Sequence, residues 1–131
     1  RIPVNSCVWW DGDLLREMLD RGTISKYIHT SKECVTIKSF REECSFNNGS
    51  KSNPCLSADI LGDWREEVIV RTHDNSELRV YTSNHPTTYR APTFMEDIPY
   101  RISVATQNVA YNQPPEPGLY FGYELSAKIG K

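Results

Sequence analysis

Two short stretches of the sequence carry acidic side chains at a matching spacing. Residues 9–19 read WWDGDLLREML, and residues 58–72 read ADILGDWREEVIVRT. A glycine, an aspartate and a glutamate of the first stretch recur fifty positions later, as the pairs Gly12 and Gly62, Asp13 and Asp63, and Glu17 and Glu67. A chance cluster of charges has no reason to keep the same internal spacing, so the repeat calls for a chemical explanation.

Carboxylates at such a spacing are suited to calcium. Ca²⁺ takes about six to eight oxygen ligands at about 2.3–2.6 Å, and one tight turn can supply several of them. The glycine before each aspartate permits that turn. We predict calcium at one or both loops, with the candidate ligands Asp11, Asp13 and Glu17 in the first and Asp59, Asp63 and Glu67 in the second. The alternative is a solvated turn in which Arg65 pairs with Glu66 or Glu67 on the surface.

A second pair of polar segments could recognise hydroxyl and carboxylate groups. Residues 47–54 read NNGSKSNP, and residues 106–115 read TQNVAYNQPP. Amides near a strand end are costly to bury without partners, so we expect them to face a ligand or to close off the strand. The candidate binding residues are Asn48, Gly49, Ser50, Lys51, Asn108 and Asn112. His73 and His85 adjoin turns, and we expect both to be exposed rather than catalytic.

The composition limits the classes of partner. The chain has 131 residues and a formal net charge of −2, from 15 Lys and Arg against 17 Asp and Glu. This balance offers no broad positive field, and no apolar run approaches the roughly 18 residues of a membrane span, so we expect neither nucleic acid nor membrane as a partner. The four cysteines form no zinc-type pair and allow either two disulfides or reduced thiols; they are Cys7, Cys34, Cys44 and Cys55.

Short strands are expected to position these residues. Segments rich in β-branched and aromatic residues lie between turns with Pro, Gly or Asn. They are residues 4–10, 24–30, 34–40, 67–72, 77–83, 87–95, 100–106 and 119–125. The sequence HDNS between two of them predicts a hairpin. A helix over residues 13–22 is an alternative, because four apolar side chains there would share one helical face.

The predicted fold class is therefore all-β, either a sandwich or the blades of a β-propeller. Repeats of about 40 to 50 residues are typical of propeller blades, so the fifty-residue echo favours the propeller. The opening RIPVNSCVWW has no Met and runs directly into a strand-like segment, which suggests a piece of a longer protein.

Longer strings carry a family resemblance. WWDGDLLREMLD, NNGSKSNPCLSADILGDWREEVIVRT, ELRVYTS and YRISVATQNVAYNQPPEPGLYFG, which fall within residues 9–122, resemble the C-terminal portion of the bacterial rhamnogalacturonan lyases of polysaccharide lyase family 11. The resemblance implies an eight-bladed β-propeller with several calcium ions. It implies endolytic β-elimination in the rhamnogalacturonan I backbone of pectin. Ser50 departs from the pattern, which has Thr after Asn-Gly.

On this resemblance, residues 1–125 would be the C-terminal blades of a larger catalytic domain, and residues 126–131 a polar tail. The expected partners are pectic polysaccharide and the remaining blades, and the expected location is outside the cytoplasm, secreted or periplasmic. No residue is assigned as the catalytic base, and the chain alone is expected to be inactive. The alternative function is a non-catalytic, calcium-stabilised propeller or sandwich that binds a glycan or a protein.

Overall fold

The computed structural model describes residues 2–109 and 111–123. These residues are mostly β, in two antiparallel sheets, with little helix. The strands are β1 (Ser6–Val8), β2 (Glu17–Asp20), β3 (Thr23–Ile28), β4 (Glu33–Ser39), β5 (Cys44–Ser45), β6 (Leu56–Ala58), β7 (Glu67–Thr72) and β8 (Leu78–Tyr81). A 3₁₀ turn, η1 (Phe94–Glu96), leads into the helix α1 (Ile98–Thr106).

The first sheet has the order β1-β2-β3-β4, so neighbours in sequence are neighbours in space. In β2, Glu17 and Leu19 are buried and alternate with half-buried residues, as expected where one face of a strand meets a core. The helical alternative for residues 13–22 is wrong, because residues 17–19 pair with β1 on one side and residues 18–20 pair with β3 on the other. Gly22 has a φ of 80°, which allows the tight β2–β3 turn.

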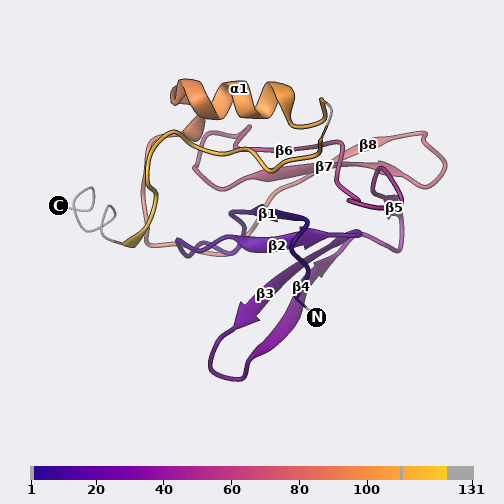
Figure 1. Cartoon of the computed structure of the whole chain (residues 1–131), viewed down its shortest axis with the longest axis horizontal. Coiled ribbons are helices and arrows are strands. Elements are labelled where there is room, and N and C mark those ends of the chain that lie inside the picture. The colour runs from indigo at the N-terminus through magenta and orange to yellow at the C-terminus, as the bar shows by residue number, and fades with distance from the viewer. Residues whose placement is uncertain (1, 110, 124–131) are drawn as a thin grey trace.

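In the second sheet, β7 is central and pairs with β5, β6 and β8. The predicted hairpin is confirmed, since β7 and β8 are antiparallel and residues 73–76 lie in their connection. Asp74 organises that turn by accepting hydrogen bonds from the hydroxyl of Thr72 and the backbone N–H of Ser76. In Figure 1, α1 lies above this sheet and the first sheet lies below it.

Two apolar clusters hold these layers together. One joins the two sheets and consists of Val8, Trp10, Leu19, Ile24, Phe40, Cys44, Val68 and Val70. The other is aromatic and joins the loops after β1 and β6 to η1 and α1, through Trp9, Leu14, Trp64, Phe94 and Tyr100. Phe121, far along the chain, completes the aromatic cluster with its ring 5.7 Å from Trp9 and 5.3 Å from Trp64.

The second half of the chain departs from the all-β expectation. Residues 100–106 are helical, not a strand, because the side chain of Asp97 caps the first turn by accepting from the N–H of Tyr100. Pro99 lies in that first turn, where a backbone N–H would have no carbonyl partner within the helix, so the lack of an N–H in proline costs no hydrogen bond. Residues 87–93 are irregular and residues 94–96 form η1, so the predicted strand 87–95 is also absent.

The final segments lie partly outside the described residues. Residues 119–122 contain no strand, and residues 124–125 of the predicted strand 119–125 lie beyond the described ranges, as does the tail 126–131. All four cysteines are free thiols. Within residues 2–109 and 111–123, no helix is long and apolar enough to cross a membrane.

Candidate functional site

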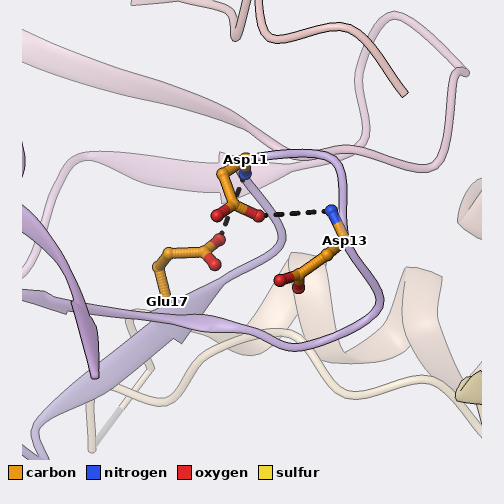
Figure 2. Close-up of side chains that lie close together, drawn as sticks. All are labelled: Asp11, Asp13 and Glu17. Carbon is orange, nitrogen blue, oxygen red and sulfur yellow. Dashed lines mark hydrogen bonds between the residues drawn. The ribbon is translucent and has the colours of Figure 1, made fainter. Parts of the chain in front are cut away.

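The first acidic loop lies between β1 and β2 and folds its carboxylates toward one point (Figure 2). One oxygen each of Asp11, Asp13 and Glu17 lies within 4.8 Å of the others. The loop's own N–H groups fix these side chains. Asp11 accepts from the N–H of Asp13 at 3.2 Å, and Asp13 accepts from that of Leu15 at 2.8 Å. Glu17 accepts from Trp10 at 2.9 Å and from Asp11 at 3.2 Å.

A cation from the neighbouring strand completes this cluster. Lys26 in β3 donates from its ammonium to Asp11 and Asp13, and the nitrogen lies 3.4 Å from an oxygen of Glu17. Burial alone would lower the pKa of Lys26, but its bonds to Asp11 and Asp13 outweigh burial and raise that pKa. Sequence reasoning missed Lys26, because it lies on another strand and outside the repeated pattern.

Glu17 is the buried member of the cluster, with 1% of its surface exposed. Burial and the charge of Asp11 raise the pKa of Glu17 to about 7, although the N–H of Trp10 and the ammonium of Lys26 favour the charged form.

The second acidic loop repeats the backbone bonding of the first. Asp63 accepts from the N–H of Arg65, two residues on, as Asp13 does from Leu15. Glu67 accepts from the N–H groups of Ile60 and Leu61 at 2.8 and 2.9 Å, as Glu17 does from the two equivalent residues of the first loop. The two loops therefore repeat each other in backbone hydrogen bonding as well as in sequence.

The other side chains of the second loop do not converge. Asp59 turns away and accepts from the hydroxyl of Thr93 at 2.7 Å and the N–H of Phe94 at 2.9 Å. Arg65 pairs with Asp63 at 2.6 Å. The alternative in which Arg65 pairs with Glu66 or Glu67 on the surface is wrong, because both glutamates are buried.

The predicted binding residues form an amide cluster around Asn53, which sequence reasoning missed. Asn53 is 5% exposed. Its side-chain oxygen accepts from Asn48 at 3.2 Å and from Asn112 at 2.8 Å, and its nitrogen donates to Asn108. Asn112 also donates to the carbonyl of Lys51 at 3.0 Å. The structure thus joins the two polar segments that the sequence singled out separately.

The exposed side of this cluster is formed by Asn48, Gly49, Ser50 and Lys51. The Lys51 ammonium lies 4.6 Å above the ring of Tyr111, which is 68% exposed. Tyr111 also borders an open depression of about 510 Å³ beside the end of α1. The depression is lined by Ser103, Thr106, Gln107, Val109, Tyr111, Gln113, Pro114 and Glu116. Such a surface of amides, a hydroxyl, an ammonium and an aromatic ring suits a sugar with a carboxylate.

Comparison with known proteins identifies the family. Residues 1–129 match the family described as rhamnogalacturonan lyase family 11, C-terminal domain. The chain belongs to this family. It is 49% identical over 121 residues to the rhamnogalacturonan endolyase YesW of Bacillus subtilis (strain 168), with 90% of this chain and 19% of the relative covered. It is 47% identical over 125 residues to the rhamnogalacturonan exolyase YesX of the same organism, covering 90% of this chain and 20% of that protein.

Solved structures of family 11 lyases agree with the fold. The crystal structure of rhamnogalacturonan lyase YesW superposes with a TM-score of 0.86 at 47% identity, covering 90% of this chain and 20% of that one. The Bacillus licheniformis rhamnogalacturonan lyase gives 0.86 at 50% identity, with the same shares covered. The chain thus spans about a fifth of the length of these family 11 proteins.

The calcium that the family resemblance implies does not fit the carboxylates of the first acidic loop as they stand. Within the described residues, only Asp11, Asp13 and Glu17 come together as a group of three acidic ligands. Their shared point is taken by the ammonium of Lys26. In the second loop, Asp63 is neutralised by Arg65, and Asp59 bonds to Thr93 and Phe94 through Oδ2, while its buried Oδ1 has no hydrogen-bond partner among the described residues.

The same family 11 core contains a buried carboxyl that sequence reasoning missed. Glu66 accepts from the N–H of Trp9 at 3.0 Å and from the hydroxyl of Tyr100 at 2.8 Å. Its own N–H donates to the carbonyl of Trp9 at 2.9 Å, so one residue ties the loop before β7 to the loop after β1. Burial raises the pKa of Glu66 to about 8, although these two donors favour its charged form. The sequence pattern did not indicate this role, because Glu66 lies next to Glu67 but is not one of the residues that recur in the two acidic loops.

Proposed function

We propose that this chain forms the C-terminal part of a rhamnogalacturonan endolyase, which cleaves the rhamnogalacturonan I backbone of pectin by β-elimination. The observation that carries the proposal is the match of residues 1–129 to the family, together with relatives that are named rhamnogalacturonan lyases. We further propose that the two sheets are blades of a β-propeller. The repeated loop geometry, fifty residues apart, supports this assignment.

The reaction needs three groups around the uronate. A base removes the proton from C5, the C4–O bond to the next sugar breaks, and a C4=C5 double bond forms. The departing oxygen takes up a proton, and the uronate carboxylate must be neutralised for the C5 proton to be removed. We assign no residue of this chain as the base.

The role we propose for this chain is to bind the polymer. Lys51 supplies a positive charge for a uronate carboxylate, and the exposed face of Tyr111 supplies a stacking surface. Asn48 is exposed, and within residues 2–109 and 111–123 its side chain has one hydrogen-bond partner, Asn53, so its amide keeps bonding capacity for a hydroxyl. Because pectin is an extracellular polymer, we also propose that the protein is secreted or periplasmic.

A hybrid protein tests the lyase assignment. The chain would replace the matching C-terminal region of Bacillus subtilis YesW, with which it is 49% identical. We expect the hybrid to release 4,5-unsaturated uronate from rhamnogalacturonan, measured by ultraviolet absorbance, and to lower the viscosity of the polymer early in the reaction, as an endolytic enzyme does. A folded hybrid that releases no unsaturated product would overturn the proposal and favour a non-catalytic glycan-binding module.

The binding role is tested in the same hybrid with Asn48→Ala. We expect KM to rise about tenfold, which corresponds to roughly 1.4 kcal/mol, with little change in melting temperature. Asn84→Ala is the matched control, since Asn84 is exposed in the segment after β8. Equal kinetics for the two variants would remove Asn48 from the binding surface.

A further inference from the structure

The carboxylates of the first acidic loop divide their oxygens between two tasks. One oxygen of each side chain accepts from the loop's own backbone N–H groups: Oδ1 of Asp11, Oδ1 of Asp13 and Oε2 of Glu17. The other oxygen of each faces a single point, and that point is the ammonium of Lys26. Three oxygens are therefore left for a cation, and all three are engaged.

The three free carboxylate oxygens match the hydrogen-bonding capacity of an ammonium and not the ligand number of a calcium ion. An ammonium has three N–H donors, one for each of these oxygens. Calcium takes about six to eight oxygens, so the three oxygens cannot serve it while the ammonium occupies their shared point; with the ammonium removed, they could bind a divalent ion whose remaining ligands are water. A divalent ion would also have to expel the positive charge of Lys26, which β3 anchors in the sheet between β2 and β4.

We propose that Lys26 is the resident cation of the first acidic loop, so that this loop folds and persists without a divalent metal. The same geometry gives a second consequence. Removing the ammonium leaves three convergent carboxylate oxygens with uncompensated charge, which is the starting arrangement of a divalent-cation site. The Lys26 ammonium thus occupies the position that a divalent metal would take in this loop.

Terbium luminescence tests both statements. Trp9 and Trp10 precede Asp11 and can sensitise terbium bound in the loop. In the wild-type chain we expect no terbium luminescence from the acidic loop, so Asp13→Asn should leave the wild-type signal unchanged. In Lys26→Met, which keeps an unbranched apolar stem, we expect terbium binding at least tenfold tighter than in the wild type. Calcium should compete for it, and adding Asp13→Asn should abolish it. Lys32→Met, in the exposed β3–β4 turn, is the control and should match the wild type.

Two outcomes overturn the proposal. One is a wild-type chain that binds terbium or calcium through Asp13, since the metal would then displace Lys26. The other is a folded Lys26→Met variant that gains no site. If Lys26→Met does not fold, the proposal can be tested in the wild type alone, by following the NMR resonance of the Lys26 ammonium protons. We expect that resonance to persist, protected from exchange, in millimolar calcium, and its loss would refute a resident lysine.

Discussion

At the scale of single residues, the carboxyl of Glu66 lies between Trp9 and Tyr100 with 1% of its surface exposed. The charged groups that face it are the carboxylate of Asp59 and the guanidinium of Arg16. Because its pKa rises from an ordinary 4.5 to about 8, the folded chain keeps a proton that the unfolded chain has lost across this window. Stability from this group is therefore present below about pH 4.5 and is lost as pH rises toward 8.

We predict that Glu66→Gln flattens this pH dependence. The wild type should lose stability between pH 5 and 9 on the order of a few kcal/mol, at about 1.4 kcal/mol for each pKa unit, and the variant should lose less, keeping the part that comes from Glu17, whose pKa rises to about 7. Urea unfolding at several pH values measures the difference. Glu42→Gln, at an exposed position between β4 and β5, should follow the wild type. Parallel curves for Glu66→Gln and the wild type would contradict the prediction.

Asn53 is predicted to matter more for stability than the residues around it. Its truncation leaves Asn48, Asn108 and Asn112 each without one hydrogen-bond partner. We expect Asn53→Ala to lower the free energy of unfolding by about 1–3 kcal/mol, measured by chemical denaturation. Ser50→Ala, in the same loop but exposed, should change it by less than about 0.5 kcal/mol. A similar cost for both would mean that the amide cluster is not a structural unit.

At this scale, the sequence predicted which residue types gather but not what they bond to. The spacing of Asp13 and Glu17 correctly marked a repeat, and the repeat proved to be one of backbone hydrogen bonding. The cation came from Lys26, whose place beside the loop depends on the β2–β3 register and is invisible in local spacing. Asn53 was missed because a polar residue in a polar loop gives no sign of burial.

At the scale of elements, α1 depends on its first turn. The carboxylate of Asp97 accepts from the N–H of Tyr100 at 3.2 Å and from that of Gly118 at 2.6 Å, so it both caps the helix and holds the returning chain. We predict that Asp97→Ala destabilises the fold by about 1 kcal/mol or more, since N-cap removal costs about 0.5–2 kcal/mol. Thermal unfolding with Glu96→Ala as the control measures this. An unchanged melting temperature for Asp97→Ala would show that the cap is dispensable.

The hairpin of β7 and β8 was predictable because periodicity, turn residues and strand propensity agree over residues 67–83. The helix was not, because residues 100–106 contain β-prone Tyr, Ile and Val that alternate well enough for a strand. What selects the helix is the cap and the burial of Tyr100 in the aromatic cluster, and tertiary contacts of this kind override propensity.

At the scale of the whole molecule, β8 forms an edge of the second sheet in the described part of the chain. Leu78 and Val80 on this strand are 68% and 58% exposed. An unpaired edge with exposed apolar side chains favours association. We predict that the isolated chain self-associates, shows no lyase activity, and associates less after Val80→Lys.

Light scattering over a range of concentrations, with an assay on rhamnogalacturonan, tests this prediction. Val35→Lys on β4, at the edge of the first sheet, is the comparison variant. If association runs through β8, Val35→Lys should reduce it less than Val80→Lys does. A monodisperse wild-type monomer would contradict the association, and a monomer that cleaves the polymer would also contradict our assignment of the chain as one part of the enzyme.

The place of Phe121 in the aromatic cluster has a consequence for how the protein is made. Of the described residues, β1 to β4 are synthesised before the second sheet, and these strands can pair with their sequence neighbours as they leave the ribosome. The cluster around Trp9 and Trp64 must wait for Phe121, which is synthesised after all of the described strands. Nascent chains stalled before residue 121 should therefore carry a finished first sheet beneath an exposed aromatic surface, the state in which chaperones would have most to protect.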